Sequence, residues 1–73
     1  MENFCVRLKD ARKKAGIVQE DAARLLGVRY STYRRYEQGG TEPTVSTAAR
    51  MARLYGVSLD YLAGLVGGEE TGQ

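Results

Sequence analysis

The sequence predicts an all-α fold, a single small domain of five helices. Apolar residues recur at three- and four-residue spacing in five segments, and glycine or proline separates these segments. With 73 residues, of which 42% are hydrophobic and 27% charged, the chain has the composition and length of one small globular core. We find no internal repeat and no linker. We therefore expect residues 1–66 to form one domain and residues 67–73 to form a disordered polar tail.

The composition excludes several kinds of chemistry. Histidine is absent and Cys5 is the only cysteine, which removes disulfides within the chain, thiolate-rich zinc sites and every nucleophile–histidine pair. Because paired carboxylates within one segment and a phosphate-binding glycine loop are also missing, we expect no enzyme activity, cofactor, metal or small-molecule ligand. No apolar run approaches the roughly 20 residues that cross a bilayer. No cleavable leader is visible, so we expect a cytoplasmic protein without a membrane partner.

The first two helices are predicted over residues 3–15 and 18–26. The helical spacing of the first segment is carried by four apolar residues, Phe4, Leu8, Ala11 and Ala15. Asn3 can cap its start, and Gly16 follows its last basic turn as a stop signal. The second segment has acidic residues in its first turn, where the helix dipole favours them, and ends at Gly27.

Residues 29–37 predict the third helix. Tyrosine and threonine, which are frequent here, are also common in strands. The apolar residues Val28, Tyr33 and Tyr36 nevertheless fit one face of a helix better than an alternating strand. Two glycines at 39 and 40 close the segment.

Two more helices are predicted after Pro43. Thr44 or Ser46 can cap a helix that runs to about residue 55. Its buried face is expected to consist of Val45, Ala48, Met51, Ala52 and Tyr55. A glycine then stops it, and Ser58 can cap a fifth helix whose apolar side consists of Leu59, Leu62, Ala63 and Val66.

The charge of the chain is unevenly distributed. Eleven Lys and Arg residues face nine Asp and Glu residues, a formal net charge of +2. All 11 basic residues and six of the acidic ones lie in residues 1–53, which gives this part a net charge of +5. The remaining three acidic residues make residues 54–73 negative. A basic body with an acidic end favours a polyanionic partner.

The second and third predicted helices are joined by a short turn around Gly27. This is the helix-turn-helix arrangement, in which the later helix can enter the major groove of DNA. Ala23 supplies the small side chain that is needed where the two helices cross, and Gly27 permits a left-handed backbone in the turn. The inward apolar residues of the third helix would anchor it to the core.

The third predicted helix has two different faces when about 100° is advanced per residue. Within one arc of about 140° lie four side chains that can hydrogen-bond, Tyr30, Arg34, Ser31 and Arg35. Tyr33 and Tyr36 fall on the opposite side, where their rings can be buried. Arginine matches the O6 and N7 atoms of guanine, and one bidentate pair discriminates between bases by roughly 1–3 kcal/mol. The first arc is therefore predicted to read bases in double-stranded DNA.

Together these features resemble the phage repressor and Cro family of helix-turn-helix proteins, often called Xre-type. The resemblance covers about residues 3–65 and rests on an ordered set of segments, Gln19 to Ala23, Gly27-Val28, Ser31-Thr32, Tyr36 to Gly39, Pro43 and Tyr55 to Leu62. It implies a lambda-repressor-like DNA-binding domain of five helices. It also implies a bacterial or phage-encoded transcriptional regulator, a repressor that binds a pseudo-palindromic operator through the major groove.

The resemblance implies roles for individual residues. Tyr30, Ser31 and Arg35 match base-reading positions of the family, and Arg34 joins them by its place on the same arc. Phosphate contacts are implied for four residues, Gln19, Arg29, Gln38 and Arg12. Arg12 and Glu37 match an ion pair that ties the first helix to the end of the third and leaves the guanidinium group able to reach DNA.

The chain departs from the family pattern at three places. Tyr33 occupies a position that is usually Ile or Val, which predicts a third helix slightly further from the first. Ala22 stands where Leu is common and would make room for that ring. Residues 39–43 lack the basic residues often found there, which predicts weaker DNA binding with a flatter salt dependence.

One recognition helix reads only a short half-site, so we expect a homodimer. Two-fold pairing would place two half-sites about one helical turn, ~34 Å, apart. The candidate pairing residues are Leu54, Leu65 and Val66. Two other roles for the same fold stay open, an antitoxin and a controller protein of a restriction-modification system. Co-purification of a basic partner would favour the antitoxin.

Overall fold

Five α-helices and no strand are present in residues 3–64, the part of the chain that the computed structural model describes. In chain order they are α1 (Phe4–Lys14), α2 (Gln19–Leu26), α3 (Tyr30–Gln38), α4 (Val45–Tyr55) and α5 (Leu59–Ala63). The all-α prediction is confirmed. Leu65, Val66 and the tail predicted at 67–73 lie outside the described residues.

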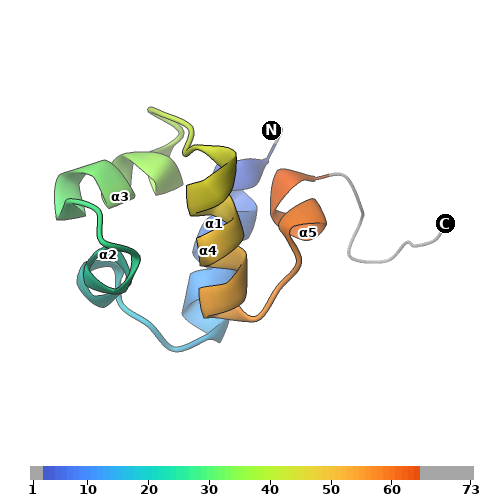
Figure 1. The fold of residues 1–73 in the computed structure, drawn as a ribbon, viewed down its shortest axis with the longest axis horizontal. Coiled ribbons are helices and arrows are strands. Elements are labelled where there is room, and N and C mark those ends of the chain that lie inside the picture. Colours follow the sequence, from blue (N-terminus) through green and yellow to red (C-terminus); the bar gives the residue numbers. More distant parts are fainter. Residues whose placement is uncertain (1–2, 65–73) are drawn as a thin grey trace, which may run out of the picture.

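The two longest helices, α1 and α4, lie at the centre of the structure (Figure 1). The pair α2 and α3 lies on one side of them and α5 on the other (Figure 1). Helix α1 contacts α3, α4 and α5, and α2 contacts both α3 and α4. Because α3 rests on α1 and α2, its inner face is covered while its outer face is left open.

Helices α1 to α4 begin and end within two residues of their predicted bounds, whereas α5 ends at Ala63, short of the predicted Val66. Two start signals act as expected. Thr44, not Ser46, caps α4, because its hydroxyl oxygen accepts a hydrogen bond of 3.1 Å from the backbone N–H of Thr47. Ser58 caps α5 in the same way, accepting from the N–H of Tyr61 at 3.0 Å.

The start signal of α1 was predicted wrongly. Asn3 does occupy the N-cap position, but its side chain makes no capping hydrogen bond. Its backbone φ of 63° is left-handed, whereas a capping side chain normally extends from a residue in the β region. Asparagine is among the residues that tolerate this conformation best, so Asn3 shapes the entry to α1 through its backbone.

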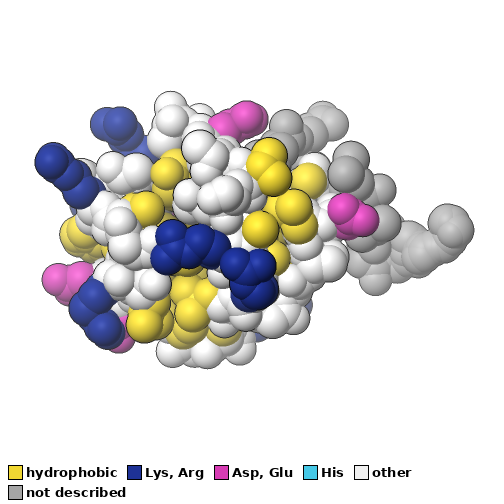
Figure 2. Space-filling model, in the orientation of Figure 1, with side chains coloured by type: hydrophobic (Ala, Val, Ile, Leu, Met, Phe, Trp, Pro, Cys, Tyr) yellow, Lys and Arg dark blue, Asp and Glu magenta, His cyan; other side chains and the backbone are white. Residues whose placement is uncertain are grey.

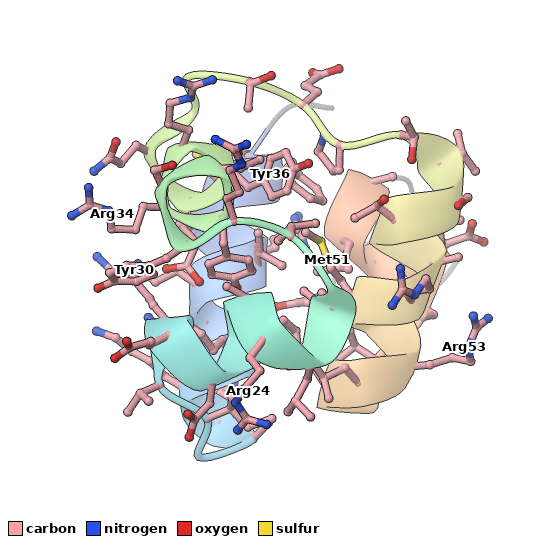
Figure 3. The ribbon with its side chains drawn as sticks, turned by 60° about the vertical axis from the view of Figure 1, so that its left-hand side comes forward. Arg24, Tyr30, Arg34, Tyr36, Met51 and Arg53 are labelled. Carbon is pink, nitrogen blue, oxygen red and sulfur yellow. The ribbon has the colours of Figure 1, made fainter. Side chains whose placement is uncertain are left out.

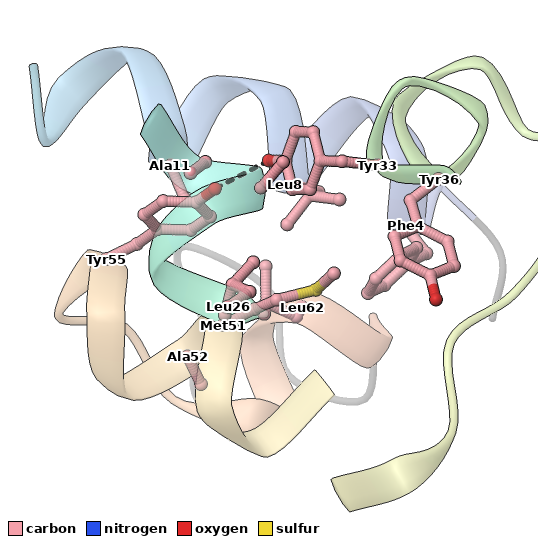
Figure 4. Packing of buried hydrophobic residues seen from close by; sticks show 12 residues of the cluster. Phe4, Leu8, Ala11, Leu26, Tyr33, Tyr36, Met51, Ala52, Tyr55 and Leu62 are labelled. Carbon is pink, nitrogen blue, oxygen red and sulfur yellow. Dashed lines mark hydrogen bonds between the residues drawn. The ribbon is translucent and has the colours of Figure 1, made fainter. Parts of the chain in front are cut away.

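The core lies where α1, α2, α3, α4 and α5 meet. Its fully buried large side chains are Tyr33, Leu8, Leu26, Met51 and Leu62. Beside them the Tyr33 and Tyr36 rings pack edge to face, with centroids 6.3 Å apart and planes at 83° (Figure 4). The most buried residue of α3 is therefore an aromatic ring that carries a polar hydroxyl.

Two residues predicted to face the core are exposed. Val45 is the first residue of α4 and its exposed fraction is 73%. Ala15 lies one residue beyond the end of α1 and is also exposed. Both follow the helical spacing, but each stands at the end of a helix. Helical spacing specifies a face of a helix and does not specify how far along the helix its partners reach.

Candidate nucleic-acid interface

The turn between α2 and α3 has the predicted geometry. Gly27 follows α2 with a φ of 73°, in the left-handed region that a side chain disfavours. The backbone carbonyl of Ala23 accepts a hydrogen bond from the N–H of Val28 at 3.0 Å, which closes the end of α2. The Ala23 side chain is buried, and α2 and α3 contact each other. The turn thus sets α3 across α2 as in a helix-turn-helix.

Helix α3 divides into an inner and an outer face. Tyr33, Tyr36 and Glu37 are buried, whereas the four predicted base-reading residues are exposed, namely Tyr30, Ser31, Arg34 and Arg35. Figure 3 shows Tyr30 and Arg34 projecting away from the body, while Tyr36 lies on the side of α3 that faces α4. The exposed arc presents guanidinium and hydroxyl groups, which are suited to hydrogen bonding with base edges in a groove of DNA.

One arginine of this arc contacts a neighbouring ring, and neither is paired with an acidic side chain of residues 3–64. The guanidinium carbon of Arg34 lies 5.0 Å from the centroid of the Tyr30 ring, a cation–π contact between residues one turn apart. Arg35 passes close to Gly40, because a side-chain carbon added at Gly40 would lie 3.7 Å from Arg35 Cβ. Within residues 3–64 neither arginine forms an ion pair with an acidic side chain. Both guanidinium groups can therefore receive a negatively charged ligand.

The predicted phosphate-binding residues lie around the edge of the exposed arc. Arg29 stands immediately before α3 and Gln38 is its last residue, and both are exposed. Gln19 is the first residue of α2 and is half-buried. The N–H groups in the first turn of a helix lack partners within the helix, so this end of α2 carries donors suited to an anion.

Positive charge is not confined to α3. In Figure 2, Lys and Arg side chains lie over the part of the face formed by α2, α3 and α4, with hydrophobic side chains between them. Two of the basic residues form exposed ion pairs within their own helices, Lys14 with Asp10 at 3.2 Å and Arg24 with Asp21 at 3.4 Å. Such exposed pairs contribute little to stability.

Beneath the exposed arc, the carboxylate of Glu37 collects four hydrogen bonds. One oxygen, Oε2, accepts from Arg12 Nε at 2.6 Å and from the Tyr33 hydroxyl at 2.6 Å. The other, Oε1, accepts from Arg12 Nη2 at 3.1 Å and from Gln19 Nε2 at 3.0 Å. The side chain of Glu37 is only 2% exposed and that of Arg12 is 9% exposed. The ion pair that the family resemblance implied is therefore the centre of a larger network.

Burial and hydrogen bonding shift the pKa values of this network. Burial alone would raise the pKa of Glu37, but the hydrogen bonds from Arg12, Tyr33 and Gln19 outweigh it and hold this pKa below its ordinary value. The hydrogen bond to Glu37 raises the pKa of Arg12 against the effect of burial. Burial raises the pKa of both the Tyr33 and Tyr55 phenols. At neutral pH the network thus contains one carboxylate, one guanidinium and two neutral hydroxyls.

Arg12 is more enclosed than the resemblance implied. Its Nη1 donates to the carbonyl oxygen of Ile17 at 2.9 Å, in addition to the two bonds that it donates to Glu37. Three of its five N–H donors are therefore occupied. Only the edge of this guanidinium group is open to a phosphate.

Comparison with known proteins agrees with this geometry. A family model described as helix-turn-helix matches residues 8–62, from within α1 to within α5. The chain belongs to the helix-turn-helix family.

Three relatives of this helix-turn-helix chain carry the names of transcriptional regulators. The HTH-type regulator ImmR of Bacillus subtilis is 41% identical over 58 residues, 80% of this chain and 46% of ImmR. The cryptic phage CTXphi transcriptional repressor RstR of Vibrio cholerae is 35% identical over 68 residues, 93% of this chain and 59% of RstR. The HTH-type regulator PuuR of Escherichia coli is 36% identical over 53 residues, 73% of this chain and 29% of PuuR.

The chain spans about half the length of the first two of these relatives and less of the third. No solved structure matches the chain significantly. None of the helices within residues 3–64 combines the length and apolar character needed to span a membrane. Over the same residues, no three His, Cys, Asp or Glu side chains are grouped so that they could hold a metal ion.

Sequence reasoning missed part of the site of this helix-turn-helix protein. Tyr33 and Tyr55 were expected to be plain core residues, yet their hydroxyl oxygens lie 2.6 Å apart and Tyr33 also donates to Glu37. The contact between Gln19 and Glu37 was not expected either. The one signal available was a tyrosine at a position where the family usually has Ile or Val. Of the candidate pairing residues, Leu54 is half-buried and packs on the core.

Proposed function

We propose that this protein is a transcriptional repressor that binds a pseudo-palindromic operator in double-stranded DNA through the major groove. The observation that carries the proposal is the division of α3. Tyr30, Ser31, Arg34 and Arg35 are exposed on one arc, while a second set is buried on the inner face, namely Tyr33, Tyr36 and Glu37. Membership of the helix-turn-helix family supports DNA as the ligand. The relative RstR is named a phage transcriptional repressor, which favours repression over the antitoxin and controller alternatives.

The proposed contacts follow from where each side chain lies. Residues of the exposed arc of α3 would read base edges, since Arg34 and Arg35 carry the donors that match guanine. Residues at its margin would fix the position of the protein on the backbone by contacting phosphates, namely Gln19, Arg29, Gln38 and the open edge of Arg12. Because its ligand would be DNA, we propose that the protein acts in the cytoplasm of a bacterial cell.

A homodimer is part of the proposal. A single α3 covers a short stretch of groove, and a two-fold pair would double the contacts and read two half-sites ~34 Å apart. The proposed pairing surface includes Leu54, Leu65 and Val66. A two-fold dimer would select an operator with two inverted halves. The sequence of the bound DNA therefore also reports on the oligomeric state.

Selection of bound sequences from a pool of random duplexes tests the proposal. We expect enrichment of one motif with two inverted halves, about ten base pairs between their centres. The variant Arg35→Ala serves as a control and should enrich a motif that is relaxed at one position in each half. Enrichment of no motif by the wild-type protein would contradict the proposal, and enrichment of an undivided motif would contradict the dimer.

A further inference from the structure

The Glu37 network continues beyond the ion pair into α4. Hydrogen bonds run from Gln19 on α2 to Glu37 on α3, from Glu37 to Tyr33, and from Tyr33 to Tyr55 on α4. Figure 4 shows the last of these bonds as a dashed line between the two phenol rings in the core. A single chain of polar contacts therefore connects the buried side of α4 with the first residue of α2, where a phosphate contact is proposed.

The direction of the hydrogen bonds in this chain can be assigned. An ionised carboxylate only accepts hydrogen bonds, so the Tyr33 hydroxyl must donate its one proton to Glu37 Oε2. The Tyr33 oxygen can then only accept from Tyr55, which is the donor in the 2.6 Å contact between the two hydroxyls. Successive donors that point the same way polarise one another, so the hydroxyl of Tyr55 strengthens the bond that Tyr33 makes to Glu37.

The same carboxylate fixes the orientation of the Gln19 amide. Only the nitrogen end of a primary amide can donate to Glu37 Oε1, so the carbonyl end of Gln19 must point elsewhere. One of the two N–H donors is used in this bond, and the second stays available to a ligand. Gln19 is the first residue of α2 and is half-buried, so part of its side chain is open to solvent.

We propose that Tyr33 and Tyr55 are positioning residues for DNA binding, which act through Glu37 to hold the Gln19 amide in the orientation that donates to a phosphate. This inference rests on the proposed DNA-binding function. It adds two buried tyrosines that touch no DNA, and it gives the hydroxyl at position 33 a function that an aliphatic residue could not supply. Ordering Gln19 before binding removes part of the entropic cost of the contact.

The test uses variants that remove the hydroxyls and leave the rings. Tyr33→Phe/Tyr55→Phe removes both hydroxyl groups together, so neither tyrosine is left with a buried, unpaired hydroxyl. Tyr61→Phe is the matched control, because it removes the same atom from a half-buried ring on α5 that lies 5.0 Å from the guanidinium carbon of Arg7. Affinity for the selected operator is measured for wild type, for both variants, and for each combined with Gln19→Ala.

We expect the Tyr33→Phe/Tyr55→Phe variant to bind the operator about three- to tenfold more weakly than wild type, the range of one lost hydrogen bond. In the Gln19→Ala background the same pair of substitutions should change affinity less than twofold, because the group they position is gone. Tyr61→Phe should bind like wild type in both backgrounds. Equal weakening in both backgrounds, or none in either, would overturn the inference.

A second measurement does not depend on DNA. In the free protein, the two side-chain N–H protons of Gln19 should resonate far apart in the NMR spectrum, because only one of them is bonded to a carboxylate. The separation should shrink in Tyr33→Phe/Tyr55→Phe and persist in Tyr61→Phe. An unchanged separation would overturn the inference even if DNA binds as proposed. A separation that shrinks in a protein whose wild type binds no DNA would overturn the proposed function while retaining the network.

Discussion

The hydroxyl oxygens of Tyr33 and Tyr55 lie 2.6 Å apart in the core and join α3 to α4. Both rings are buried, with exposed fractions of 0% and 7%. Helix α3 is thus tied to α4 by a polar contact. Tyr33 also donates to Glu37, whereas Tyr55 donates only to Tyr33. Removal of each hydroxyl should therefore change the free energy of unfolding by a different amount.

Tyr33→Phe should destabilise the protein more than Tyr55→Phe does. Loss of the Tyr33 hydroxyl deprives the buried carboxylate of a donor and leaves the Tyr55 hydroxyl without its acceptor, a cost of about 1–3 kcal/mol in the free energy of unfolding. Loss of the Tyr55 hydroxyl leaves the bond from Tyr33 to Glu37 in place and should cost about 0.5–1.5 kcal/mol. Urea denaturation of both variants measures the difference. A larger cost for Tyr55→Phe would contradict the assigned direction of the hydrogen bonds.

Acid should destabilise the protein through Glu37. The pKa of this carboxylate is lowered in the folded state, so its stabilising effect is complete above the ordinary value of about 4.3 and is lost as the pH falls through the folded pKa. Thermal unfolding followed between pH 7 and pH 2 should show this loss. The NMR titration of the Glu37 carboxyl carbon in wild type should give a midpoint below that of a free glutamate.

The matched variant for the acid experiment is Glu37→Gln, which cannot ionise. It leaves the buried charge of Arg12 without its partner, so we expect it to be less stable than wild type at pH 7 by about 3–5 kcal/mol. Its stability should depend less on pH below 5 than that of wild type. An equally steep decline in both proteins would show that other carboxylates cause the acid sensitivity.

Gly27→Ala should weaken the turn between α2 and α3. A residue with a side chain is less stable than glycine at a φ of 73° by about 1–2 kcal/mol. The new methyl group would have no atom closer than 4.0 Å, so new packing contacts would not offset this cost. Gly40→Ala is the control, since its φ lies outside the left-handed region and its added carbon would make ordinary contacts with Arg35. The midpoint of thermal unfolding should fall in Gly27→Ala and change little in Gly40→Ala. The reverse order would contradict the assigned role of the turn.

Arg35→Ala and Arg29→Ala should affect DNA binding differently, although both residues are exposed. The first removes a proposed base contact, so discrimination at one base pair should drop by roughly 1–3 kcal/mol. The second removes a proposed phosphate contact, so all sequences should bind more weakly and the salt slope should decrease by about one. Titrations with the operator and with a mutated operator at several salt concentrations separate the two. Identical behaviour would contradict this division of roles.

The helices and the turn were predictable because their signals are local. Gly27 ends α2 and Ser58 caps α5, and each does so through residues within one helical turn. Signals of this kind depend only on residues that are close in the sequence. The two exposed residues predicted to be buried, Val45 and Ala15, show the limit of such signals. Their spacing is correct for a buried face, but the reach of the neighbouring helices depends on how the whole chain packs.

The ion pair between Arg12 and Glu37 was expected only from the family resemblance, since 25 residues separate the two positions. The bonds from Gln19 to Glu37 and between Tyr33 and Tyr55 also span long stretches of sequence, 18 and 22 residues. No periodicity links such positions. In the sequence, Tyr33 is recognisable only as a large ring suited to a core. The hydrogen bond between its hydroxyl and that of Tyr55 exists only because the fold places α4 beside α3.

The amino-acid sequence by itself determined five helices, a glycine turn between the second and third, and a third helix with its arginines on one face and Tyr33 and Tyr36 on the other. The tertiary structure alone decided that a single buried carboxylate would join α1, α2 and α3, and that a pair of hydroxyls would extend this junction to α4. The physical reason is that helix formation depends on near neighbours in the chain. A buried charge must instead satisfy every one of its hydrogen-bonding positions with whatever groups the packed helices bring within about 3 Å.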